Sequence, residues 1–196
     1  MIKKLKFFIL FQPENILFKT NQENSIIKIT DFGFSRRFIN DSNEKFYTFC
    51  GTEGYFAPEI LNSNGHNLKV DCWSLGVILY VMLCGFHPFF QEDKEREREN
   101  ILNAKFEFPS PYWDSISDNA KDLINKLLVL DIERRLSAKE ILEHPWLNTQ
   151  NSREQLPFSA DIYNKMTKKF KIVNNLFNLF FLLIFFSVMQ QLLNLL

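Results

Sequence analysis

The sequence predicts one mainly α-helical domain that begins with a short pair of β-strands. Three observations support this fold class. Residues Val70–Cys84 are apolar on nearly every side, which is typical of a helix in the centre of a helical domain. Residues Asp118–Leu130 place apolar side chains at helical spacing, and two short runs rich in β-branched residues near the start suit paired strands.

The two runs predicted to pair are Asn15–Phe18 and Ser25–Ile29, and polar turn residues separate them. Asp31 follows the second run directly. After the central helix, Gly85 supplies a natural C-terminal stop. Residues Gln91–Asn100 alternate acidic and basic side chains, which predicts the solvated face of a helix.

The last helices are predicted from periodicity and capping. Within Asp118–Leu130 the inward positions are Ala120, Leu123, Ile124, Leu127 and Leu128. Residues Ser137–Glu140 fit a capping box that opens a last short helix, Ile141–His144, and Pro145 is expected to end it.

Composition limits the chain to one core and excludes several kinds of partner. The 196 residues are 46% hydrophobic, enough for one domain with tails. The 23 basic and 23 acidic side chains cancel, so no overall field draws the chain to nucleic acid. Cys50, Cys72 and Cys84 are odd in number and widely spaced, which argues against disulfides or a zinc site and favours the cytoplasm.

Four regions are predicted along the chain. Residues 1–11 form a short apolar leader, which lacks the length and cleavage site of a secretion signal. Residues 12–147 form the globular domain, residues 148–171 a polar and basic linker, and residues 172–196 an uncharged hydrophobic tail.

Several motifs follow one another in a fixed order. Asn15 precedes the strand pair, Asp31-Phe32-Gly33 ends it, Ala57-Pro58-Glu59 follows a polar loop, and Asp71-Cys72-Trp73 begins the buried helix. Together with the stretches CGTEGYFAPEIL, DCWSLGVILYVMLCGFHPFF and EHPWL, this set resembles eukaryotic serine/threonine protein kinases. It is most similar to the calcium/calmodulin-dependent group, and within it to the MAP-kinase-activated kinases.

The resemblance covers Gln12 to about Leu147 and implies a kinase C-terminal lobe, a helical bundle with a short strand pair. The family transfers phosphate from ATP, and oxygen ligands hold the Mg²⁺ that neutralises the phosphates. By resemblance, Asp31 and Asn15 are the metal ligands, and ATP and Mg²⁺ are the cofactors.

The position of the family's catalytic base is Leu10, five residues before Asn15. The preceding His and Arg positions are Phe8 and Ile9, and Gln12 replaces the catalytic-loop lysine. Leucine neither accepts a proton nor orients a hydroxyl, and no residues match the N-terminal lobe that clamps ATP. We therefore expect this chain alone to be inactive, with weak or absent ATP binding.

Two interpretations explain these departures. One is a pseudokinase fragment that acts as a docking or regulatory module, through the surface around Phe86–Phe90 and the charged helix. The other is an incomplete gene model whose first residues derive from non-coding sequence. The abrupt end of the resemblance at Phe11 favours the second interpretation.

The resemblance also assigns roles downstream. The activation segment includes Asp31, Phe32, Gly33, Thr48, Thr52, Ala57, Pro58 and Glu59, and an upstream kinase is expected to phosphorylate Thr48. Glu59 and Arg135 resemble a buried structural ion pair. Asp71 and Trp73 are expected to be structural, and Glu14 implies protein substrates with basic residues.

The hydrophobic tail leaves three interpretations open. Residues 172–196 carry no charge, and basic side chains precede them, as in a membrane anchor. The polar flanks make a spanning helix marginal, so an amphipathic segment that covers the lobe or binds calmodulin, and translation of non-coding sequence, are the alternatives. The expected location is the cytoplasm, with membrane association through this tail as the variant.

Overall fold

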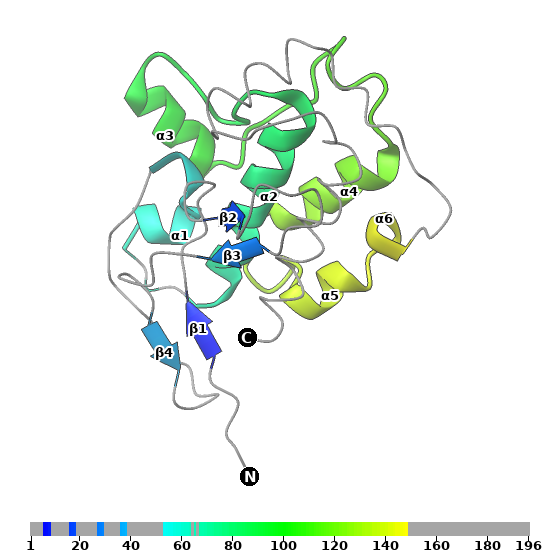
Figure 1. The fold of residues 1–196 in the computed structure, drawn as a ribbon. Helices are drawn as coiled ribbons and strands as arrows, with labels where there is room; N and C mark the ends of the chain where they lie inside the picture. Colours follow the sequence, from blue (N-terminus) through cyan, green and yellow to red (C-terminus); the bar gives the residue numbers. More distant parts are fainter. Residues whose placement is uncertain are drawn as a thin grey trace.

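The computed structural model describes residues 53–63, 65 and 67–147 with their side chains, together with the backbone of Asn148 and of four short strands near the start. The helices gather around one central helix, and the strands precede them in the sequence (Figure 1). This arrangement agrees with the predicted mainly α-helical domain.

The four strands form two antiparallel pairs. Strand β2 (Ile16–Phe18) pairs with β3 (Ile27–Ile29), with Ile16 opposite Ile29, so the predicted strand pair is confirmed. Strand β1 (Lys6–Phe8) pairs with β4 (Arg36–Phe38), and this second pair was missed. Strand β1 lies within the predicted apolar leader, residues 1–11, and the assignment of that leader stays a prediction.

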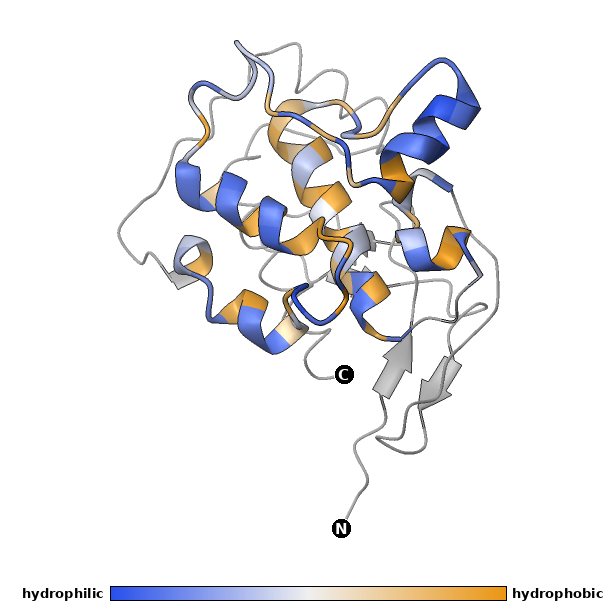
Figure 2. Ribbon diagram, turned by 180° about the vertical axis from the view of Figure 1, so that it is seen from behind, coloured by the Kyte–Doolittle hydropathy of each residue, from blue (hydrophilic) through white to orange (hydrophobic). Residues whose placement is uncertain are grey.

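Helix α2 (Lys69–Cys84) is the centre of the core. All its residues from Val70 to Cys84 are buried except Met82, and the helix is hydrophobic over most of its surface (Figure 2). Gly85 ends it in the left-handed region at φ 86°, where its backbone N–H donates to the carbonyl oxygen of Val81. The predicted buried helix and its glycine stop are confirmed.

Two short elements precede α2. The 3₁₀ helix η3 (Glu53–Tyr55) leads into α1 (Pro58–Leu61), which begins with a proline whose missing N–H costs a helix start nothing. All four residues of α1 are buried, including the carboxylate residue Glu59. A buried charge requires a partner. For Glu59 this partner is Arg135.

Helix α3 (Lys94–Leu102) has the predicted solvated, charged face and also a buried face. Asp93 caps it by accepting from the backbone N–H of Glu95, and most of its charged side chains are exposed. Most of the helix is hydrophilic (Figure 2). Glu97 and Ile101, however, are buried, because one face packs against α1 and η3. Sequence alternation alone could not show which charged residues turn inward.

Helix α4 (Asp118–Leu127) packs along α2 as the amphipathic pattern predicts. Ser117 caps it by accepting from the backbone N–H of Ala120. A Cβ at Gly76 would lie 2.8 Å from Cβ of Leu127, so the two helices approach too closely for any larger residue. The helix ends at Leu127, three residues earlier than expected, since Leu128 leaves helical geometry at ψ 57°.

The predicted capping box is present at the start of α5 (Ala138–Leu142). Ser137 and Glu140 bond reciprocally, and the hydrogen bond from the Ser137 hydroxyl holds the pKa of Glu140 below its ordinary value. The expected helix Ile141–His144 ending at Pro145 is wrong in its bounds. Pro145 instead begins α6 (Pro145–Asn148), because proline fits the first position of a helix as well as it ends one.

Helices α4 and α6 are joined by a polar contact. His144 is buried, and its Nε2 lies 3.0 Å from Oδ2 of Asp122. The same carboxylate accepts from Lys126, and this hydrogen bond is the main reason why the pKa of Asp122 is lowered. The backbone N–H of Trp146 donates to Nδ1 of His144, so the ring links three segments.

The hydrophobic tail 172–196 and the linker before it lie outside the described residues. Among the helices that the structure describes, none combines the length and the apolar character needed to cross a membrane.

Candidate functional site

The residues predicted to act in catalysis, metal binding and substrate binding lie in a different part of the chain from the residues predicted to be structural. The base position Leu10, the metal positions Asn15 and Asp31, and Glu14, Phe32, Gly33, Thr48 and Thr52 lie outside the described residues. The structure does place Ala57, Pro58, Glu59, Asp71, Trp73 and Arg135. The part of the site that the structure describes is therefore the end of the expected activation segment, together with the residues that contact it.

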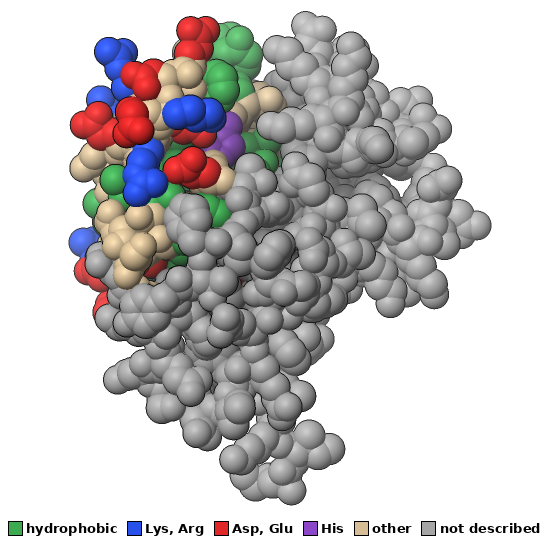
Figure 3. Space-filling model, turned by 90° about the vertical axis from the view of Figure 1, so that its left-hand side faces the viewer, with side chains coloured by type: hydrophobic (Ala, Val, Ile, Leu, Met, Phe, Trp, Pro, Cys, Tyr) green, Lys and Arg blue, Asp and Glu red, His purple; other side chains and the backbone are tan. Residues whose placement is uncertain are grey.

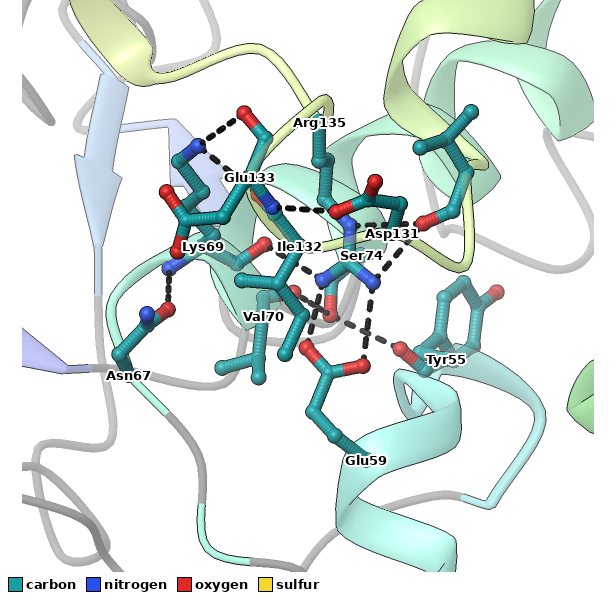
Figure 4. Close-up of polar contacts among 11 residues, drawn as sticks. Tyr55, Glu59, Asn67, Lys69, Val70, Ser74, Asp131, Ile132, Glu133 and Arg135 are labelled. Carbon is teal, nitrogen blue, oxygen red and sulfur yellow. Dashed lines mark hydrogen bonds and ion pairs between the residues drawn. The ribbon is translucent and has the colours of Figure 1, made fainter.

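A buried ion pair fixes α1 to the loop before α5. Nη1 of Arg135 lies 2.6 Å from Oε1 of Glu59, and Nη2 lies 3.0 Å from Oε2, so the fork geometry is bidentate (Figure 4). The Arg135 side chain is fully buried and that of Glu59 is 7% exposed. The two residues are 76 positions apart, and the pair ties the end of the expected activation segment to the lower helices.

Every N–H group of the Arg135 guanidinium has an acceptor. Besides the two bonds to Glu59, Nη1 donates to the carbonyl oxygen of Lys69 at 3.1 Å. Nε and Nη2 both donate to the carbonyl oxygen of Val129, at 3.2 and 3.0 Å. Five donors with five acceptor contacts are the condition under which a guanidinium can be buried without a large desolvation cost.

An aromatic stack covers the ion pair. The Arg135 guanidinium carbon lies 5.1 Å from the ring centroid of Trp73, within the range of a cation–π interaction. Phe89 stacks on Trp73 at 5.6 Å with the rings 8° from parallel. Both rings are fully buried, so they exclude water from the charges and strengthen the attraction between them.

The first turns of α2 hold the backbone on either side of the pair. Ser74 donates through its hydroxyl to the carbonyl oxygen of Tyr55 at 2.8 Å, which fixes η3 (Figure 4). Lys69 donates through Nζ to the carbonyl oxygens of Ile132 and Glu133, at 2.8 and 3.1 Å, which fixes the loop that carries Arg135. The α2 N-terminus thus holds both partners of the pair in place.

Asp71 lies in the first turn of α2 with its side chain fully buried. The partial positive charge at a helix N-terminus stabilises a carboxylate there. The partner that resemblance implies for Asp71, the backbone of the catalytic loop, lies outside the described residues. Nearby, burial is the main cause that raises the pKa of the Cys72 thiol to about 12, so this thiol stays protonated and unreactive.

Sequence reasoning missed a third attachment, which comes from α3. Arg98 donates through Nη2 to the carbonyl oxygen of Leu61 at 2.8 Å, and Nη1 lies 3.3 Å from Oε1 of Glu53. One side chain therefore bridges the beginning of η3 and the end of α1. The available signal was Ile101, an apolar residue three positions after Arg98 on the face that packs inward.

The backbone of Gly54 packs tightly beneath α3 and the loop after α2. A Cβ at this position would lie 3.0 Å from Nε2 of His87 and 3.6 Å from Oε1 of Glu97. Tyr55 also meets the His87 ring edge to face, with centroids 5.4 Å apart. The stretch from Glu53 to Leu61 is thus held by α2, by α3 and by Arg135.

This arrangement is suited to positioning a peptide segment. Among the side chains that the structure describes, no group of three histidines, cysteines or carboxylates could hold a metal ion. The buried side chains of Arg135 and Ser74 donate to backbone carbonyl oxygens or to the Glu59 carboxylate. The described part of the site holds the segment rigidly, and the expected metal ligands belong to residues beyond it.

Comparison with known families gives a match over most of the chain. A family model described as "Protein kinase domain" matches residues 11–147. We call Ser74, Arg98 and Arg135 the anchor, because these three side chains hold the stretch Glu53–Leu61. All three, and the stretch that they hold, lie inside this match.

Curated relatives are similar over the same region. The chain is 42% identical over 166 residues to "Myosin light chain kinase A" of Dictyostelium discoideum, covering 83% of this chain and 56% of the relative. It is 44% identical over 155 residues to "Serine/threonine-protein kinase DCLK3" of Mus musculus, covering 74% and 19%. It is 50% identical over 143 residues to "Probable serine/threonine-protein kinase fhkE" of Dictyostelium discoideum, covering 70% and 20%.

Each match covers a larger share of this chain than of the relative. This chain spans about half the length of the first relative and about a fifth of the other two. The first match covers 83% of this chain, more than residues 11–147, so the similarity continues outside that segment on at least one side.

Proposed function

Because the chain belongs to the protein kinase family, we propose that residues 12–147 are the C-terminal lobe of a serine/threonine kinase of the calcium/calmodulin-dependent group, nearest to the MAP-kinase-activated kinases. The lobe presents a protein substrate along the segment that ends at α1. The observation that carries this proposal is the anchor itself, in which Arg135, Ser74 and Arg98 hold residues Glu53–Leu61 from three directions. A segment held in this way can keep a bound peptide in register.

We assign the metal chemistry to Asn15 and Asp31. Carboxylate and amide oxygens suit Mg²⁺, and the metal neutralises the phosphates of ATP when it is bound. This assignment is supported by the strand register, in which Ile16 lies opposite Ile29, because in the sequence Asn15 comes directly before Ile16 and Asp31 comes two residues after Ile29.

We also propose that the 196-residue polypeptide does not transfer phosphate on its own, because Leu10 occupies the position of the base. A leucine side chain can neither orient a substrate hydroxyl nor take its proton. The same lobe would then serve as a docking or regulatory module. The leucine at position 10 favours this second function.

Two further assignments belong to the proposal. Thr48 is the site at which an upstream kinase adds a phosphate, and Glu14 selects protein substrates with basic residues. The lobe is cytoplasmic, in keeping with the free thiols of Cys72 and Cys84. Membrane association through residues 172–196 is the variant, and a fusion of this tail to a fluorescent protein that stays soluble after fractionation would exclude it.

Binding of labelled ATP to the chain, measured with and without Mg²⁺, tests the metal assignment. We expect weak binding that requires Mg²⁺ and is lost in Asp31→Ala, whereas the control Asp114→Ala, an exposed carboxylate in the described part, leaves it unchanged. Binding that is independent of Mg²⁺ or insensitive to Asp31→Ala would refute the assignment.

A further inference from the structure

Helix α6 is the last element that the structure describes, and His144 lies directly before it. The carbonyl oxygen of His144 accepts from the backbone N–H of Leu147 at 2.9 Å, and its ring atom Nδ1 accepts from the backbone N–H of Trp146 at 3.3 Å. Pro145 has no N–H to satisfy. His144 therefore caps the first turn of α6 with both its backbone and its ring, as serine or asparagine caps other helices.

The two hydrogen bonds of the ring determine where its proton lies. A backbone N–H can only donate, so Nδ1 must carry a lone pair in order to accept from Trp146. In the neutral ring the single proton is then on Nε2, which donates to Oδ2 of Asp122 at 3.0 Å. The neutral ring thus bonds to α6 on one side and to α4 on the other.

The ring is buried where α6 packs on the rest of the lobe. The His144 side chain is 4% exposed, and Trp146 is buried and belongs to the hydrophobic core. Helix α6 packs against α4 and α5 (Figure 1). A change of charge at this ring therefore acts on a packed contact between helices.

A second proton on the ring has opposite effects on its two contacts. A proton on Nδ1 faces the N–H of Trp146, so this hydrogen bond is lost and two donors meet inside the lobe. The positive ring attracts Asp122 more strongly, but that carboxylate is 47% exposed and already lies 2.6 Å from Nζ of Lys126. An exposed, shared carboxylate adds little, whereas a buried N–H without an acceptor is costly, so the loss outweighs the gain.

The charged groups nearest to the ring come from α4 and α5. Asp122 stays ionised, since the hydrogen bond from Lys126 is the main cause that lowers its pKa. On α5, Glu140 is held in the capping box, and Lys139 lies 3.9 Å from Glu143 with both side chains exposed. The dense charges of α3 lie on the other side of the lobe, where acidic and basic side chains are side by side (Figure 3). Salt screens such exposed charges, so the two contacts of the ring decide the effect of its protonation.

We propose that His144 is a pH-sensitive switch for α6, in which the neutral ring holds α6 on α4 and protonation of the ring releases it. A histidine gains its second proton between about pH 8 and pH 5, so acid favours the released form and base favours the docked form. Residues 149–196 follow α6 in the sequence, so the switch controls how firmly the start of the predicted linker is held against the lobe. It uses neither ATP nor the residues of the proposed function.

Amide hydrogen exchange of the intact chain, followed by NMR at about pH 7.5 and about pH 5.5, tests the switch. The quantity measured is the protection factor, which is the intrinsic exchange rate divided by the observed rate at the same pH. For the amides of Trp146 and Leu147 we expect it to fall about tenfold from the higher pH to the lower, the effect of losing an N-cap. The amides of α2 should stay protected at both pH values, which shows that the lobe remains folded.

Two substitutions separate the two contacts of the ring. Asparagine can place its amide oxygen where Nδ1 lies, and glutamine can place its amide group where Nε2 lies. His144→Asn should therefore keep the Trp146 amide protected at both pH values, and His144→Gln should leave it weakly protected at both. His66→Asn removes another histidine and should leave the pH dependence of the wild-type chain in place.

Three results would overturn the proposal. The first is an equal protection factor at the two pH values in the wild-type chain. The second is a pH dependence in His144→Asn as large as in the wild-type chain, because another group then titrates. The third is a nitrogen NMR spectrum of the neutral His144 ring with the proton on Nδ1, because such a ring cannot cap α6.

Discussion

Replacing Glu59 with alanine would leave the Arg135 guanidinium buried without a counter-charge. The wild-type contact is bidentate, at 2.6 and 3.0 Å, and both side chains are almost entirely buried. Removing one partner of such a pair costs about 3 to 5 kcal/mol, mostly because the remaining charge stays desolvated. For a lobe of this size, that loss lowers the melting temperature by roughly 10 to 15 °C.

Urea unfolding followed by circular dichroism measures this loss, with the soluble yield recorded alongside it. Glu143→Ala is the matched control, because Glu143 also faces a lysine, at 3.9 Å, with a side chain that is 66% exposed. A surface pair of this kind contributes less than about 1 kcal/mol. If Glu59→Ala is insoluble, Glu59→Gln keeps one acceptor oxygen and allows the unfolding measurement.

We expect the loss of unfolding free energy in Glu59→Ala to be several times larger than in Glu143→Ala. Equal losses in the two variants, or a loss at Glu59 below about 1 kcal/mol, would show that water or a rearranged side chain compensates the guanidinium.

Three further predictions address the core, the thiols and the pH dependence. Gly76→Ala should destabilise the lobe by about 1 to 3 kcal/mol in urea unfolding, because its Cβ would lie 2.8 Å from that of Leu127; a neutral effect would show that α2 and α4 can separate freely. Iodoacetamide at about pH 8 should leave Cys72 and Cys84 unmodified in the folded chain and label both after denaturation, as seen by peptide mass spectrometry, since burial raises both pKa values to about 12. Because the pKa of Asp122 is lower in the folded state than its ordinary value of 3.8, ionised Asp122 stabilises the folded state at pH values above 3.8. This stabilisation is lost as the pH falls through the pKa of the folded state, so the difference in unfolding free energy between wild type and Asp122→Asn should shrink below about pH 4. A difference that stays constant with pH would contradict this assignment.

The elements that sequence predicted correctly are those specified locally. The all-apolar run of α2, its glycine stop and the Ser137–Glu140 capping box each depend on neighbouring residues. The pairing of β1 with β4 was missed because it joins three-residue strands that are far apart in the chain. Pro145 was misassigned because proline both ends helices and begins them.

The residues of the candidate site also differ in how far the sequence could predict them. Glu59 and Arg135 are 76 residues apart, so only the resemblance to a family indicated the pair, and the structure places the two side chains in contact. Arg98 was missed because three basic residues alternate with acidic ones along α3, and packing decides which of them turns inward. The assignments of Leu10, Asn15, Asp31 and Thr48 stay predictions, because these residues lie outside the described part of the chain.

Phosphate transfer from Mg·ATP to a basic serine peptide, measured on the purified chain beside Asp31→Ala, tests the central claim most directly. Because resemblance assigns the position of the base to Leu10, we expect the chain and the Asp31→Ala variant to give the same background. Turnover at the usual kinase rate of about 1 to 100 per second, lost in Asp31→Ala, would contradict it.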